Sequence, residues 1–188
     1  AAVVVPVACS TNTYSVSGTV SGLVAGTTLV LHSSVGDVLP LVGSAASGPL
    51  DFAFPTKVAS GAVWSVDVQT KPVGPSQTCT VTAGAGTMAG ADVTNVSVAC
   101  VVDRFFVRAA VSGLGSGTLV LAQGADTLNV TSNGTSAFAT KIASGGTYSV
   151  TATSVPANHE CVVNSGSGVV GNGDVTVSVT CQGRKTVG

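Results

Sequence analysis

The same sequence pattern occurs twice in this chain. The stretch from Tyr14 to Cys100 contains SVSGTVSGL, TTLVL, TKVASG and a final VSVAC, and the stretch from Phe105 to Cys181 contains VSGL, GTLVL, TKIASG and a final VSVTC in the same order. A repeat of this length is a domain, because the rungs of solenoid proteins span roughly 20–50 residues. The sequence therefore predicts two tandem domains of similar fold, and it favours an array or a polymer over a solitary enzyme.

A shorter third copy of the pattern lies at the start of the chain, where two valines and a cysteine recur at the spacing that ends each repeat. We therefore expect three parts: residues 1–9 as an N-terminal strand and possible donor strand, residues 10–100 as the first β-sandwich repeat, and residues 101–188 as the second repeat with a short C-terminal tail. The three copies are Val5, Val7 and Cys9; Val96, Val98 and Cys100; and Val177, Val179 and Cys181.

The composition favours β-structure and excludes several classes of protein. Hydrophobic residues make up 45% of the chain, charged residues 8%, and the formal net charge is −1. Valine and threonine suit a pleated surface, whereas the strong helix formers are scarce. The hydrophobic content is too high for a disordered chain. There is no basic stripe to bind nucleic acid and no apolar run of about 18 residues to span a bilayer, so we expect neither nucleic-acid binding nor membrane insertion.

Short alternating segments indicate the fold class. One face of a first strand carries Tyr14, Val16, Gly18 and Val20, with serine and threonine on the other face, and Phe105, Val107, Ala109 and Val111 are its counterparts in the second repeat. Gly, Pro, Asn and Asp separate such segments along both repeats. About seven short strands per domain, punctuated by turn residues, are typical of an antiparallel sandwich of immunoglobulin-like architecture. Asn133-Gly134 predicts a hairpin turn between two strands. The expected fold class is all-β: two tandem antiparallel β-sandwich (immunoglobulin-like) domains with an N-terminal extra strand.

Four of the five cysteines occupy equivalent positions in the two repeats, which predicts the disulfides Cys79–Cys100 and Cys161–Cys181. Disulfides indicate an oxidising compartment. The alternatives are reduced, buried cysteines or zinc ligands, and zinc is disfavoured because no Cys-x-x-Cys pair is present. Cys9 is left over, and it is an intermolecular cross-link, a free thiol or a vestige of the repeat.

Catalytic groups are scarce, and the sequence predicts no enzyme, cofactor or metal site. His32 and His159 are the only histidines, and no nucleophile elbow accompanies them. The aspartates at positions 37, 92, 126 and 174 are interpreted as turn residues that cap their own backbone, with calcium binding near Asp92 or Asp174 as the alternative. Trp64 and Tyr148 are interpreted as core residues, with carbohydrate platforms as the alternative. Lys57 and Lys141 are interpreted as exposed lysines that discourage edge pairing, with a partner or glycan contact as the alternative.

These motifs resemble a known kind of repeat. The phrases SVSGTVSGL and TLVL, the phrase TKxASG before an aromatic strand, and the paired cysteines ending in VTNVSVAC are similar to tandem immunoglobulin-like β-sandwich repeats of bacterial extracellular and surface proteins. The resemblance covers nearly the whole chain. It implies an extracellular or cell-surface location and a place in a fibre, an adhesin or a stalk, and it points to no catalytic activity.

The apolar N-terminal segment carries the functional hypothesis. An exposed, uncharged strand of this kind invites pairing with another sheet, with Val3, Val5 and Val7 as inward side chains and the amide position of Pro6 facing away. We expect Cys9 to lie at the same intermolecular contact. The prediction is an extracellular bacterial fibre whose subunits polymerise head-to-tail with copies of themselves. The alternative is a fragment of a longer cell-surface adhesin or stalk built from the same repeats.

Overall fold

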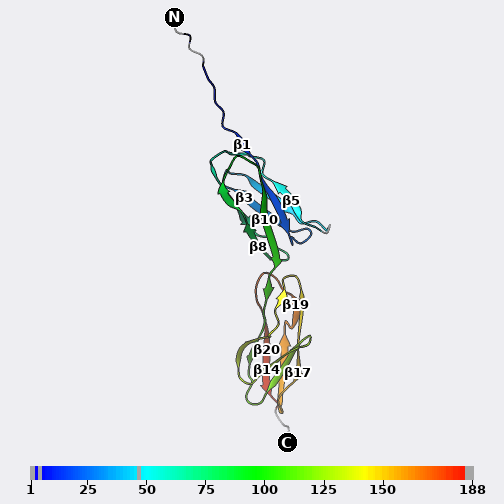
Figure 1. Cartoon of the computed structure of the whole chain (residues 1–188). Helices are drawn as coiled ribbons and strands as arrows, with labels where there is room; N and C mark the ends of the chain where they lie inside the picture. Colours follow the sequence, from blue (N-terminus) through cyan, green and yellow to red (C-terminus); the bar gives the residue numbers. More distant parts are fainter. Residues whose placement is uncertain (1–2, 4–5, 46–47, 185–188) are drawn as a thin grey trace. The chain divides into compact units, whose positions relative to one another are not determined.

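The computed structural model describes residues 3, 6–45 and 48–184. Within these ranges every regular element is a β-strand (Figure 1). The chain forms two compact units that divide between Val101 and Val102, with the short segment Val73–Ser76 grouped with the second unit. No helix among the described residues has the length and apolarity needed to cross a bilayer.

The first unit contains two four-stranded sheets and one two-stranded sheet. The strand orders are β5-β2-β10-β8 and β4-β3-β7-β9, and β1 pairs with β6. The bounds are β1 Thr13–Tyr14, β2 Val16–Ser21, β3 Thr28–Ser33, β4 Val38–Val42, β5 Leu50–Ala53, β6 Val58–Ala59, β7 Val63–Thr70, β8 Gln77–Thr82, β9 Ala85–Thr87 and β10 Val93–Val102.

The core of the first unit lies between its two four-stranded sheets. Along β2 and β7 the inward side chains are buried while their neighbours are more exposed, which is the period of two expected of a strand with one face in a core. Both sheets contribute to a single cluster of buried side chains. Its members from the four central strands are Val16, Val20, Leu29, Leu31, Trp64, Val66, Val96, Val98 and Cys100.

The second unit repeats this arrangement, with strand orders β15-β12-β20-β18 and β14-β13-β17-β19 and a β11-β16 pair. Its core cluster again draws on both sheets and includes the fully buried Val107, Leu121 and Val179. The bounds are β11 Arg104–Phe105, β12 Val107–Ser112, β13 Leu119–Gln123, β14 Asp126–Val130, β15 Gly134–Ala137, β16 Ile142–Ala143, β17 Thr147–Ser154, β18 His159–Asn164, β19 Ser167–Val169 and β20 Val175–Gly183.

The expectation of two tandem β-sandwiches is confirmed, but the sheets are not purely antiparallel. The last strand of each repeat pairs parallel with its first long strand, β10 with β2 and β20 with β12. Parallel neighbours need a long connection, and here the rest of the repeat supplies it. Alternation of side chains is the same in parallel and antiparallel strands, so the sequence pattern could not distinguish the two.

The predicted hairpin at Asn133-Gly134 is wrong. β14 pairs with β13 and β15 pairs with β12, so the chain crosses from one sheet to the other at this point. The side-chain oxygen of Asn133 accepts a 2.8 Å hydrogen bond from the backbone N–H of Leu114. Gly134 has a φ of 136°, a region that favours glycine, so the Asn-Gly pair serves a crossover.

Each unit contains one disulfide, Cys79–Cys100 in the first and Cys161–Cys181 in the second, the pairing that the duplicated spacing predicts. In the second unit the two cysteines are direct partners in the ladder between β18 and β20. Each disulfide therefore ties the last strand of its repeat to the strand at the edge of the same sheet.

Candidate functional site

The N-terminal segment, defined here as Val3–Cys9, has an apolar sequence, and its described residues are all exposed. Val3 is 86% exposed and Val7 is 82% exposed. Val3 and Pro6–Asn12 belong to no strand, so the described part of residues 1–9 shows no strand within this single chain. Cys9 is an exposed free thiol. Val5, the remaining residue of the predicted contact, lies outside the described residues.

Directly after this segment, the chain enters the first unit as it enters the second. The carbonyl of Asn12 accepts a hydrogen bond from the backbone N–H of Ser60, and the carbonyl of Asp103 accepts one from Ser144. β1 then pairs with β6 as β11 pairs with β16. Residues 9–14 therefore correspond without a gap to residues 100–105. Apart from this correspondence between the two repeats, nothing in the sequence predicts the short β1–β6 pairing.

The equivalent last strands show what this segment's sequence does when it lies in a sheet. β10 lies between β2 and β8, and β20 lies between β12 and β18, so both strands pair on two sides. Val98 and Val179, the counterparts of Val7, are fully buried. Pro6 replaces Ser97 and Ser178. Because proline has no N–H, the segment suits a sheet edge, where one side of the backbone stays unpaired.

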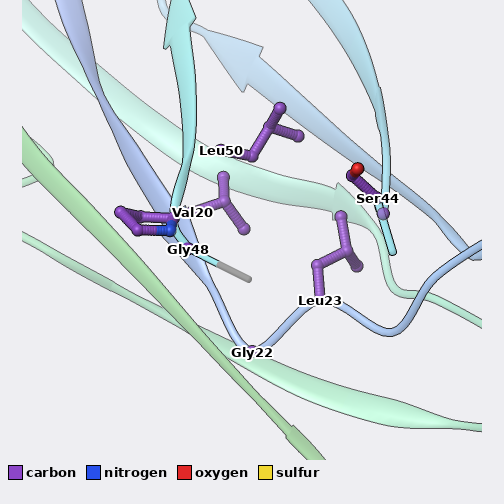
Figure 2. Close-up of a pocket in the computed structure, with 8 residues that line it drawn as sticks. Val20, Gly22, Leu23, Ser44, Gly48 and Leu50 are labelled. Carbon is purple, nitrogen blue, oxygen red and sulfur yellow. The ribbon is translucent and has the colours of Figure 1, made fainter. Parts of the chain in front are cut away.

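A pocket of about 390 Å³ in the first unit shows no catalytic arrangement (Figure 2). Figure 2 shows the side chains of Val20, Leu23 and Leu50 around it, with Ser44 at one side. The hydroxyl of Ser44 is the one side-chain heteroatom in the lining. An acid–base pair is therefore missing among these described residues. The full lining is Val20, Gly22, Leu23, Gly43, Ser44, Gly48, Pro49 and Leu50.

The histidines make structural contacts. His32 Nδ1 lies 3.3 Å from Asp67 Oδ1 on an exposed face, and His159 Nδ1 lies 3.0 Å from the carbonyl oxygen of Ala157 in its own turn. In the described part of the chain, no three His, Cys, Asp or Glu side chains come together in a way that could hold a metal ion.

The four turn aspartates hydrogen-bond backbone N–H groups, but these groups lie in distant loops and not in the aspartates' own turns. Two of them tie the Thr-Lys loops: Asp37 accepts from the N–H of Thr56, and Asp126 accepts from the N–H of Thr140. The expectation of local capping is therefore wrong, because the loops of the sandwich bring distant N–H groups within reach of these carboxylates.

The other two aspartates accept hydrogen bonds from backbone N–H groups directly before the first long strand of each unit. Asp92 accepts a 2.7 Å hydrogen bond from the N–H of Ser15, and this bond lowers the pKa of Asp92 below its usual value. Asp174 accepts from Arg108 at 2.7 Å and from the N–H of Phe106 at 2.8 Å. The Arg108 contact and then the Phe106 N–H lower the pKa of Asp174.

Replacing Asp174 with asparagine is expected to reduce the stability of the second unit at neutral pH and to weaken its dependence on acid. The folded-state pKa of Asp174 lies below the unfolded value of about 3.9, so the carboxylate stabilises the fold above that pH. This contribution disappears as the pH falls through the lowered pKa. Urea unfolding from pH 7 to pH 2 should show wild type and variant converging in acid, and a gap that widens in acid would contradict the assignment.

The repeated aromatic and lysine positions differ in their surroundings. Trp64 is 5% exposed and belongs to the core, as interpreted from its strand. Tyr148 packs against the core of the second unit, and its hydroxyl donates a 3.4 Å hydrogen bond to the carbonyl of Ser165. Lys57 and Lys141 are exposed, and Lys141 Nζ lies 4.6 Å from the centre of the Phe106 ring.

Comparison with known proteins gives structural similarities at low sequence identity. No protein-family model matches the chain, and no curated protein matches it. Among solved structures, the Bacillus anthracis TIE protein is similar with a TM-score of 0.49 and 12% identity, covering 91% of this chain and 34% of that protein. This chain therefore spans about a third of the length of that protein.

Two structures from Lactobacillus rhamnosus GG are also similar. The C-terminal fragment of the pilus adhesin SpaC has a TM-score of 0.39 and 13% identity, covering 93% of this chain and 100% of the fragment. The shaft pilin SpaA has a TM-score of 0.31 and 12% identity, covering 92% of this chain and 99% of the pilin. With TM-scores below 0.5, these similarities assign neither a family nor a function to the chain.

Proposed function

We propose that this chain is a structural subunit of an extracellular fibre, and that it polymerises head-to-tail by adding its N-terminal segment as a β-strand to a sheet of another copy. The observation that carries this proposal is the N-terminal segment itself. It has the residue spacing of β10 and β20, yet Val3 and Val7 remain 86% and 82% exposed in the isolated chain.

The physical reason is that a sheet would pair the backbone of such a segment and also bury its apolar side chains. Strand addition pairs its backbone with the edge of the acceptor sheet, and alternating pockets receive every second side chain. Burial of Val3, Val5 and Val7 would remove apolar surface from water at about 25 cal/mol per Å². An uncharged strand left in solvent would instead aggregate without register.

The geometry of such a contact favours a filament. The segment lies at one end of the chain, and the surface that receives it is a different part of another copy. A contact between two different surfaces extends indefinitely unless its rotation closes a ring. Disulfides in both units suit the oxidising environment that an extracellular fibre would meet.

Deleting residues 1–9 is expected to leave a folded monomer and to abolish fibres. Both compact units keep their cores and disulfides without these residues, so circular dichroism and urea unfolding should match the full chain. Negative-stain microscopy and sedimentation velocity at matched protein concentration measure assembly.

The matched control is Cys9→Ala, which keeps the strand and removes the exposed thiol. This variant should still assemble, because backbone pairing and valine burial carry the contact. Fibres formed by the deletion variant would contradict the proposal. If Cys9→Ala forms no fibres while Pro6→Ala still does, assembly depends on the thiol instead.

A second candidate function is a module of a longer surface stalk. The gapless correspondence of residues 9–14 with residues 100–105 favours it, because the joint before the first unit then repeats the joint before the second. In that case the N-terminal segment is the last strand of a preceding repeat, and purified chain stays monomeric at every concentration tested.

A further inference from the structure

A strand donated by a second copy needs a sheet edge long enough to pair with it. The N-terminal segment runs from Val3 to Cys9. Among the described residues, two edge strands of the four-stranded sheets, β8 and β18, are six residues long. β4 and β14 have five residues, β5 and β15 have four, and β9 and β19 have three. On length alone, the candidate acceptor edges are therefore β8 of the first unit and β18 of the second.

These two equivalent edges differ in how well their inward side chains are covered. In β8, Gln77 is fully buried and Cys79 is 8% exposed. In β18, the matching His159 and Cys161 are only half-buried. The sheet that ends at β18 therefore retains accessible surface on its inner side, which an added strand would cover.

The cause of this difference is a hydrogen-bond network at Gln77. Among the described residues, only the first unit has such a network. Gln77 Oε1 accepts bonds from the N–H of Val24 and the hydroxyl of Thr27, and Gln77 Nε2 donates to the carbonyl of Gly22. The loop that follows β2 is thereby fastened over the start of β8. His159 occupies the same position in β18 and instead bonds the carbonyl of Ala157 beside it.

The outer face of β18 also differs from that of β8. Val162 is 52% exposed, whereas its counterpart in β8 is Thr80. Val162 borders a groove of about 300 Å³ together with Glu160, Thr180 and Gln182. The outward positions of the N-terminal segment, if Val3, Val5 and Val7 face inward, are valine, proline and alanine. An apolar side chain on the outer face of the acceptor edge matches such a strand better than a threonine does.

We propose that the free edge of β18 is the acceptor for the N-terminal segment of a second copy. This inference rests on the proposed function and names the surface that function requires. The segment pairs with the backbone of β18, Val3, Val5 and Val7 cover the inner side that His159 and Cys161 leave accessible, and Pro6 directs its missing N–H away from β18. Val162 contacts the outward side chains of the segment.

The test compares Val162→Lys with the matched variant Thr80→Lys in the full chain. Both positions are exposed and outward on edge strands of equal length, so both variants should fold. A lysine on an edge opposes strand addition, and Val162→Lys should raise the protein concentration needed for assembly at least about tenfold. Thr80→Lys should leave that concentration unchanged.

Hydrogen exchange on assembled wild-type protein supplies a second readout that needs no substitution in β8 or β18. Amides of β18 should exchange more slowly in fibres than in the monomer formed by the variant lacking residues 1–9, and amides of β8 should not change. Assembly of Val162→Lys at the wild-type concentration, equal loss in both lysine variants, or unchanged exchange in β18 would each overturn the assignment to β18. Fibres formed without residues 1–9 would overturn the proposed function instead, so the two failures are distinguishable.

Discussion

Replacing Gly18 with alanine is expected to destabilise the first unit by more than about 3 kcal/mol while the second unit stays folded. A Cβ atom at Gly18 would overlap the carbonyl oxygen of Val96, which is backbone of the neighbouring strand β10. Backbone cannot move aside as a flexible side chain can. The substitution must therefore separate β2 from β10 at the centre of the sheet, where Val16, Val96 and Val98 are buried.

The need for glycine follows from a bulge that the second unit lacks. In the first unit Val93 pairs with Val16 and Val96 pairs with Gly18, so β10 has one residue more than β2 across this stretch. In the second unit β20 and β12 pair without a shift. Ala109 is the counterpart of Gly18 there, and it is fully buried without difficulty. A β-bulge brings the extra backbone close to its partner strand.

Trp64 makes this prediction easy to measure, because it is the one tryptophan of the chain and it is buried in the first unit. Its fluorescence during urea unfolding reports the first unit alone. Ala109→Gly is the matched control and should cost only about 1 kcal/mol in the second unit. Combining Gly18→Ala with deletion of Asn95 should restore stability, since the bulge is then removed. An unchanged Trp64 transition in Gly18→Ala would contradict the bulge explanation.

Removing the disulfide of the second unit by Cys161→Ala and Cys181→Ala is expected to lower the free energy of unfolding of that unit by about 3 kcal/mol. The disulfide closes a stretch with a sequence separation of 20 residues, and its loss returns conformational freedom to the unfolded chain. Cys181 is also 3% exposed, so truncation leaves a small void beside Val177 and Val179.

Far-UV circular dichroism during urea unfolding measures this loss, and Trp64 fluorescence serves as the internal control. The Trp64 transition should not move, because the tryptophan reports the first unit, whose Cys79–Cys100 disulfide is intact. Adding reductant to the wild-type protein should lower the stability of both units. Equal stability of the oxidised and reduced wild type would show that the disulfides contribute nothing to folding.

The repeat and the alternation of side chains were enough to predict two β-sandwiches. Alternation at residues such as Val96 and Val98 depends only on which face of the strand is buried, and the sequence shows this directly. The same alternation is blind to the direction of a neighbour, so the parallel pairing of β2 with β10 could not be predicted. The three-residue strands β9 and β19 could not be predicted either, because each is very short and contains a glycine.

The candidate site could likewise be predicted from the sequence only in part. The N-terminal segment could be identified from the sequence, because Val5, Val7 and Cys9 repeat the residue spacing that ends each of the two predicted domains. The difference between the edges of β8 and β18 could not. It arises from three hydrogen bonds of Gln77 to a loop that lies 50 residues or more away in sequence. Such contacts become visible only in three dimensions.

A structure of the assembled fibre at side-chain resolution tests the central claim most directly. We predict a continuous ladder of backbone hydrogen bonds between the N-terminal segment of one copy and a sheet edge of the next, with Val3, Val5 and Val7 buried against the acceptor. A fibre in which that segment is free in solvent, or pairs only within its own chain, would contradict strand addition as the basis of assembly.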